Sequence, residues 1–229
     1  MSAESEVHDK VLGSFKENVT RFLLNYVARF ALAGVVLYSS YIALIRVTWF
    51  TWHVILCTAG YVPLMAESII LFLGDELWTR QLNRTQKYWV HGILISLATF
   101  FIIVGNALVF HKLQSGYHLY TAHGITGLIS MILIIAAIPV GLAINYANEI
   151  KRVLTVRPLW YKAIHNFLGL LGYVIGIISL AFAFYTKWFV YYTGPEARML
   201  SLVATILGSI WMVNGALVSM YHQIKSLVT

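Results

Sequence analysis

Four histidines each stand near the beginning of a long apolar segment. They are His53 in TWHVILCTAG, His91 in YWVHGILISL, His123 in TAHGITGLIS and His165 in KAIHNFLGLLG. An imidazole can bind a metal, transfer a proton or join two helices by a hydrogen bond. A histidine inside a bilayer is rare and is by default a candidate functional residue. One such residue on each of four consecutive segments predicts a shared chemistry rather than four separate hydrogen bonds.

The segments that carry these histidines are apolar enough to cross a membrane. The chain of 229 residues is 59% hydrophobic and 11% charged, with a mean hydropathy of +0.76, whereas a soluble domain has roughly 25% charged residues. Apolar runs of about 20 residues recur along its length, which predicts an all-α membrane protein with six transmembrane helices. The expected spans are Phe22–Ile45, Phe50–Leu73, Tyr88–Phe110, Leu119–Ile144, Tyr161–Tyr185 and Ala197–Met220.

The connections between the spans are short, so neighbouring helices should be antiparallel and both termini should lie on one side. Of the 16 lysines and arginines, 12 fall on that side, which the positive-inside rule places in the cytosol. We expect a cytosolic tail over residues 1–21, one transmembrane domain over 22–220 and a second cytosolic tail over 221–229. The net charge of +7 then reflects topology. No basic run with interleaved aromatic residues indicates binding of nucleic acid.

The direction of each helix sorts the histidines into two levels. His53 and His123 fall near the outer surface, and His91 and His165 fall near the cytosolic surface. With a rise of about 1.5 Å per residue, the two levels should be roughly 20 Å apart. Two imidazoles from facing helices form the axial ligands of a haem iron, whereas zinc needs three or four protein ligands. The pattern predicts two haems b and a transmembrane electron carrier, in which the second to fifth helices form the haem-binding core.

Small residues follow each histidine on its own helix face. In the fifth span Gly169, Gly172 and Gly176 follow His165 in this way. Gly141 likewise follows His123 in the fourth span, and Gly105 follows His91 in the third. Small residues in membrane helices usually indicate close helix packing. A groove of them below every histidine is interpreted here as space for a flat porphyrin.

Glu67 lies fourteen residues after His53, and so on the same face of a continuous helix. A carboxylate inside a membrane is costly and needs a partner or a proton. Two interpretations stay open for Glu67. It either accepts a proton or contacts the inner haem near its propionates, or it is a hydrogen-bonding strut to a neighbouring helix.

Basic residues precede the two helices of the inner histidine pair. Lys87 and Arg84 stand before His91, and Arg157 and Lys151 stand before His165. Cations that converge there would attract a small anionic substrate, although the positive-inside rule alone also accounts for basic residues at this surface. Lys87 is the best of the four candidates, because it lies one turn before His91 on the same face.

The local sequences resemble the cytochrome b561 family over nearly the whole chain. The strings TWHVILCTAGYVPLMAESIILF, AHGITGLIS and YKAIHNFLGLLGYVIGIISLAFAFY are similar to the family's second, fourth and fifth helices. Val54 stands where family members commonly have a proline. The resemblance implies axial ligation of the cytosolic-side haem by His91 and His165, and of the outer haem by His53 and His123.

The resemblance also implies an activity and a setting. Cytosolic ascorbate would be the electron donor, and monodehydroascorbate or Fe3+ in a lumen would be the acceptor. It further implies a homodimer in the bilayer of the endoplasmic reticulum or of cytoplasmic vesicles.

Two other functions are compatible with the residues. The first is a di-haem membrane anchor that relays electrons to or from a separate partner enzyme or quinone. The second is a haemless channel or assembly factor, in which the histidines line a proton path.

Overall fold

The computed structural model describes residues 3–72, 79, 81–114, 118–146 and 157–228, and the regular structure in those ranges is helical. Six helices are long and apolar enough to cross a membrane, which confirms the predicted fold class. The elements are α1 Ala3–Ile45, α2 Trp49–Ala59, η1 Gly60–Met65, α3 Ala66–Ile70, α4 Arg84–Lys112, α5 Ala122–Asn145, α7 Pro158–Ala183, α8 Lys187–Tyr192 and α9 Pro195–Val228.

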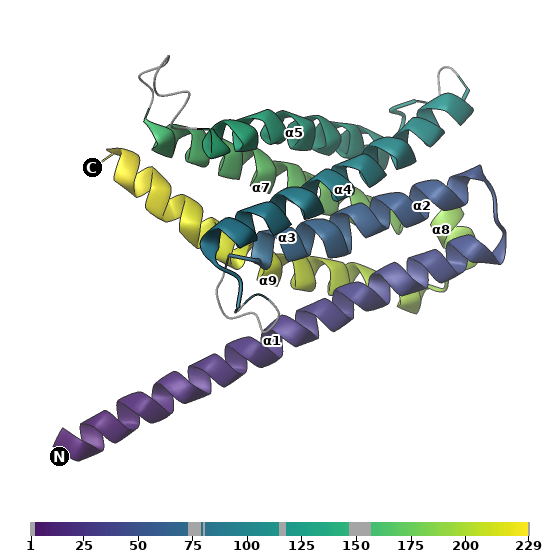
Figure 1. Ribbon diagram of the computed structural model, residues 1–229. Helices are drawn as coiled ribbons and strands as arrows, with labels where there is room; N and C mark the ends of the chain where they lie inside the picture. The colour runs from purple at the N-terminus through teal and green to yellow at the C-terminus, as the bar shows by residue number, and fades with distance from the viewer. Residues whose placement is uncertain (1–2, 73–78, 80, 115–117, 147–156, 229) are drawn as a thin grey trace.

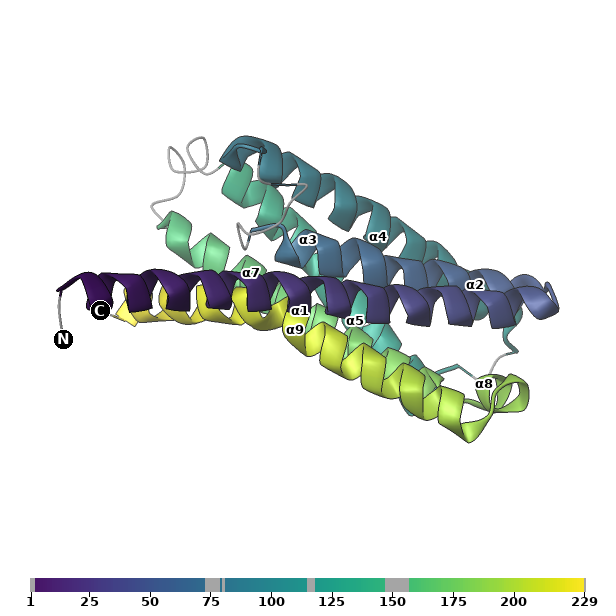
Figure 2. The same cartoon turned by 90° about the horizontal axis from the view of Figure 1, so that it is seen from below.

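Successive spans alternate in direction, and the two termini lie at the same end of the bundle (Figure 1). The central part consists of two antiparallel pairs, because α2 packs against α4 and α5 packs against α7. Helices α1 and α9 contact each other and flank these pairs, as the turned view in Figure 2 shows. Each central helix therefore begins at the opposite end from its pairing partner.

Side-chain caps set where two of the histidine helices begin. The backbone N–H of Gln86 donates a hydrogen bond to Oδ1 of Asn83, and the backbone N–H of Asn83 donates one to Oε1 of Gln86, both at 2.9 Å. This capping box satisfies two backbone donors and starts α4. Thr121 caps α5 in a similar way by accepting from the N–H of Gly124 at 3.1 Å. The capped starts differ by a few residues from the spans predicted by hydropathy.

The second span is not one continuous α-helix. Between α2 and α3, the segment η1 is a π-helix that contains Pro63. Proline has no N–H to donate, and its ring clashes with the carbonyl four residues earlier in an α-helix. A π-turn is wider and takes up one extra residue. The predicted span Phe50–Leu73 is present as a candidate membrane helix over Trp49–Ile70, but this turn rotates the residues beyond it relative to an unbroken α-helix.

Helical structure continues through both predicted tails. Helix α1 begins at Ala3 and α9 ends at Val228, so no break marks the predicted boundaries at residues 21 and 221. The placement of these ends outside the bilayer stays a prediction. The short helix α8 was not expected, and its start is fixed by Thr186, whose hydroxyl accepts from the N–H of Phe189.

The outer surface of the bundle is apolar, as lipid contact requires. Phe30 is 75% exposed and Leu200 is 71% exposed. The interior of the bundle is filled mainly by apolar side chains, and among them Ile70 and Ile102 have no exposed surface. This packing holds the backbones of the central helices in fixed register.

Candidate functional site

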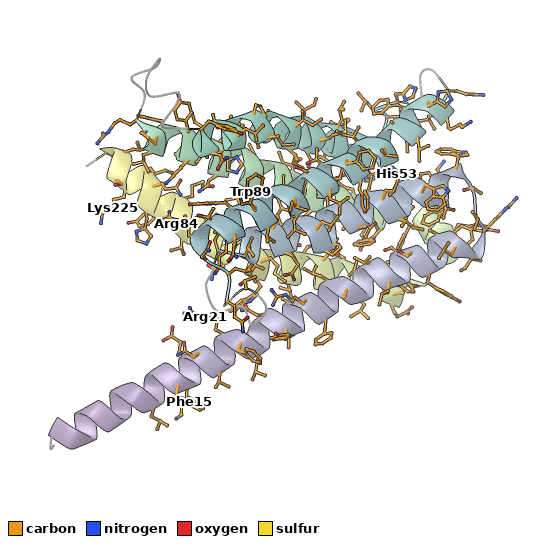
Figure 3. The ribbon with its side chains drawn as sticks, viewed as in Figure 1. Phe15, Arg21, His53, Arg84, Trp89 and Lys225 are labelled. Atoms are coloured by element: carbon orange, nitrogen blue, oxygen red, sulfur yellow. The ribbon has the colours of Figure 1, made fainter. Side chains whose placement is uncertain are left out.

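The four histidines meet as two pairs with the same geometry. His53 of α2 faces His123 of α5, with ring centroids 6.0 Å apart and ring planes at 76°. His91 of α4 faces His165 of α7, again at 6.0 Å and 76°. Figure 3 shows His53 toward the end of the bundle opposite Arg84, which begins the helix of the second pair. The two pairs therefore lie at two levels along the bundle.

Each histidine is oriented by a backbone carbonyl of its antiparallel neighbour. The Nδ1 atom of His53 lies 3.0 Å from the oxygen of Gly105 on α4. The other three Nδ1–oxygen contacts are His91 with Ser68 at 3.1 Å, His123 with Ser179 at 2.9 Å, and His165 with Ala137 at 3.0 Å.

A carbonyl oxygen can only accept a hydrogen bond. The contacts therefore assign the proton of each neutral imidazole to Nδ1, so that Nε2 carries a free lone pair. Metal-binding histidines typically use the same outer hydrogen bond to fix the tautomer and the ring orientation.

The spacing of the rings fits a metal between them. A metal–imidazole bond is about 2.0 Å long and the ring centre lies about 1 Å beyond the nitrogen, so two axial imidazoles place their ring centres about 6 Å apart. Both pairs have a separation of 6.0 Å. Within the part of the chain that the structure describes, no group of three or more His, Cys, Asp or Glu side chains could hold a metal ion. Two ligands per level suit a macrocycle that supplies the remaining four.

His53 and His123 both line a cavity of about 180 Å³. Aromatic side chains form part of its wall, among them Phe50, whose ring centroid lies 5.3 Å from that of His53. Gly127 and Trp188 also line it. A wall of aromatic and small residues suits a flat apolar ligand.

Most of the small residues expected to line a porphyrin groove instead make room for protein. A Cβ atom on Gly172 would meet Ile134, one on Gly176 would meet the ring of Tyr61, and one on Gly105 would meet Cys57. These positions allow close helix packing. Two other glycines of the expected groove do not contact a packing side chain. A Cβ atom on Gly141 would meet the ring of His165, and a Cβ atom on Gly169 would have nothing within 4 Å.

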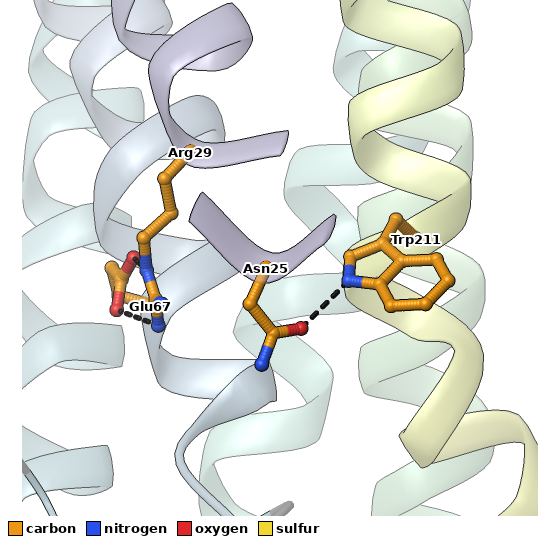
Figure 4. A network of polar contacts seen from close by, with 4 residues as sticks. All are labelled: Asn25, Arg29, Glu67 and Trp211. Atoms are coloured by element: carbon orange, nitrogen blue, oxygen red, sulfur yellow. Dashed lines mark hydrogen bonds and ion pairs between the residues drawn. The ribbon is translucent and has the colours of Figure 1, made fainter. Parts of the chain in front are cut away.

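Glu67 contacts the outer helix α1 rather than a histidine. Its Oε2 accepts a hydrogen bond from Arg29 Nη2 at 3.0 Å, and Arg29 Nε donates to its other carboxylate oxygen (Figure 4). One turn earlier on α1, the side-chain oxygen of Asn25 accepts from Trp211 Nε1 at 2.7 Å. Of the two interpretations of Glu67, these contacts favour the strut. The π-turn is the reason, because it rotates the residues that follow it.

Three of the four candidate cations for a substrate lie where the helices of the inner pair begin. Arg84 and Lys87 stand in the first turn of α4, and Arg157 precedes α7. The side chain of Arg84 is exposed and its Nε donates to the hydroxyl of Tyr88 at 3.0 Å, whereas Lys87 is half-buried. Lys151 lies outside the described residues.

Two serines at the site were missed by the sequence analysis. Ser68 places its hydroxyl 2.7 Å from Nδ1 of His91, and Ser179 places its hydroxyl 3.0 Å from Nδ1 of His123. Ser179 lies fourteen residues after His165, and this distance along α7 reaches the level of the other histidine pair, where Ser179 contacts His123. A search for polar residues fourteen positions after each histidine could therefore have found it. The same search would have selected Glu67 rather than Ser68.

Comparisons with known proteins identify a family model and several reductases that are similar to this chain. Residues 52–190 match the family model described as eukaryotic cytochrome b561. The transmembrane reductase CYB561D2 of Mus musculus is 29% identical over 72% of this chain and 74% of its own, and that of Homo sapiens is 28% identical over the same shares. The plasma membrane ascorbate-dependent reductase CYBRD1 of Mus musculus is 30% identical over 40% of this chain and 32% of its own.

No solved structure matches the chain. The names of the relatives support an oxidoreductase activity. The family model covers more than half of the sequence and includes all four histidines. The chain therefore belongs to the cytochrome b561 family, and this membership implies that it binds haem b.

Proposed function

We infer that this protein is a di-haem transmembrane reductase that moves electrons from ascorbate on one side of a membrane to an acceptor on the other. The observation that carries this function is the repeated pairing of histidines, with the same ring separation at two levels of one bundle. A single level would suit a local redox enzyme. Two levels, separated by about fourteen residues of helix and so by roughly 20 Å, span most of a bilayer about 30 Å thick.

The sides of the membrane follow from the basic residues. Arg84, Lys87 and Arg157 begin the helices that carry His91 and His165, and the positive-inside rule places this end in the cytosol. Ascorbate is an anion at neutral pH and would be attracted to these cations. At the other end the acceptor would be monodehydroascorbate or Fe3+ in a lumen. A homodimer in the endoplasmic reticulum or a vesicle membrane is the setting typical of the family.

The chain itself contributes ligation, orientation and insulation. Nε2 of each histidine would hold a haem iron, while Nδ1 stays bonded to the neighbouring helix. When bound, the two haems would supply the one-electron chemistry. The apolar side chains packed between the two levels would insulate the haems from water. The test is to mix the purified protein with ascorbate alone. We expect reduction without a partner, and a requirement for a second protein or a quinone would contradict the proposal.

Replacing Lys87 with alanine should weaken the binding of ascorbate while leaving the haem content normal. A charge pair near the water interface contributes up to about 1 kcal/mol, which corresponds to about a fivefold rise in the ascorbate concentration for half-maximal reduction. Lys112→Ala is the matched control, because Lys112 ends the same helix at the opposite side. An unchanged concentration dependence in Lys87→Ala would exclude this residue from the ascorbate site.

Replacing Gly141 with alanine should displace His165. The added Cβ would lie 2.8 Å from Cε1 and 3.0 Å from Nδ1 of that ring, which is closer than van der Waals contact. We expect the haem content to fall from two toward about one per chain, measured as pyridine haemochrome. Gly34→Ala on α1 is the control, because nothing lies within 4 Å of the new Cβ and the residue belongs to neither histidine pair. Equal haem content in the two variants would show that His165 does not hold haem in this orientation.

A further inference from the structure

Each carbonyl that orients a histidine lies at a fixed distance along the sequence from the histidine of its own helix, with one exception. Gly105 lies fourteen residues after His91 on α4, Ala137 lies fourteen after His123 on α5, and Ser179 lies fourteen after His165 on α7. In the second span, the carbonyl that contacts His91 belongs to Ser68, which lies fifteen residues after His53. This span therefore contains one residue more than the other three between its histidine and its carbonyl.

The extra residue is taken up by the π-helix at Gly60–Met65. A π-turn closes over five residues instead of four, and it inserts one residue without changing the direction of the helix. Pro63 stands inside it and disfavours an α-helical hydrogen bond at this point. Without the insertion, the fourteenth position would be that of Glu67.

The shift of one residue separates two side chains of different charge. Ser68 has no exposed surface, and both its hydroxyl and its carbonyl oxygen approach Nδ1 of His91, at 2.7 and 3.1 Å. Glu67 is turned to α1, where Arg29 binds its carboxylate. The π-turn thus places a neutral hydroxyl beside the histidine at the position where an unbroken helix would place a carboxylate.

We propose that Ser68 is a positioning residue for His91, and that its hydroxyl sets the reduction potential at the inner histidine pair. This proposal rests on the proposed function, because it requires a redox group on His91. With the carbonyl already accepting the Nδ1–H, the hydroxyl is a second acceptor that makes the imidazole a stronger electron donor. Stronger donation stabilises the oxidised metal and lowers its potential.

The outer pair provides an internal comparison. Ser179 contacts Nδ1 of His123 through its hydroxyl at 3.0 Å and its carbonyl at 2.9 Å. One histidine of each pair therefore has a serine with the same two contacts. Replacing the two serines one at a time should change the two redox centres separately.

The experiment is a potentiometric titration of the purified protein, followed by visible absorbance, for wild type, Ser68→Ala and Ser179→Ala. In Ser68→Ala we expect the reduction potential of one of the two haems to rise. At a fixed ambient potential, the ratio of its reduced to its oxidised form should increase about tenfold, which corresponds to about 59 mV for one electron. In Ser179→Ala the reduction potential of the other haem should rise instead. In each oxidised variant, the electron paramagnetic resonance signal should change for the same haem whose potential shifts.

Haem content separates this proposal from the proposed function. A wild-type protein with two haems reducible by ascorbate, together with unchanged potentials in Ser68→Ala, would overturn the role of Ser68 and leave the reductase intact. A shift of the same couple in both variants would also overturn it. A wild-type protein that binds no haem would overturn the function itself.

Discussion

Replacing His91 with alanine is expected to remove the haem nearest the cytosolic surface and to stop the fast reduction by ascorbate. His91 and His165 would together hold the haem at this level, and one remaining imidazole would not be enough to retain it. The haem content should fall from two to about one per chain, and part of the visible spectrum should remain. His165→Ala should behave in the same way, because it removes the other ligand of the same pair.

His53→Ala should give the complementary result. Its pair with His123 lies at the other level, so reduction of a luminal ferric acceptor should be lost while ascorbate still reduces the remaining haem. His222→Ala is the control, since His222 lies in the last turns of α9 and belongs to neither pair. If His91→Ala and His53→Ala lost the same half of the spectrum, or if both kept two haems and turnover, the pairing would be wrong.

Replacing Arg29 with alanine is expected to destabilise the bundle more than removing both charges of its ion pair. The side chains of Arg29 and Glu67 are only 16% and 26% exposed, on helices that cross the membrane. Removing one partner of a buried pair leaves an uncompensated charge and costs about 3–5 kcal/mol. The midpoint of thermal unfolding in detergent should therefore fall clearly in Arg29→Ala.

The double variant Arg29→Ala with Glu67→Gln is the matched control for this pair. Because it also removes the charge of Glu67, it should recover a large part of the lost stability. Equal unfolding midpoints for the single and the double variant would mean that the two side chains do not depend on each other.

The fold could be predicted because a bilayer restricts the chain to long apolar helices. Hydropathy located all six spans, and the direction of each span sorted the histidines into levels that match the pairs seen in the structure. Helix ends were less accurate, because caps such as Asn83 and Thr121 start the helices independently of hydropathy.

The environment of the site was harder to predict. Counting residues at 3.6 per turn placed Glu67 on the face of His53. The π-turn that contains Pro63 shifts the helical register by one residue. The sequence alone does not reveal how a proline inside a membrane helix is accommodated. Gly141 and Gly176 were both predicted to line a groove. One accommodates a histidine ring and the other accommodates Tyr61, a difference that depends on helix packing and not on residue type.

The central claim is that paired imidazoles at two levels hold two haems b in one chain. It is tested most directly by a pyridine haemochrome count on the purified protein, combined with its visible spectrum before and after ascorbate is added. We predict two haems b per chain, both reducible by ascorbate. A colourless protein prepared with ample haem, or one with a single haem per chain, would contradict the claim.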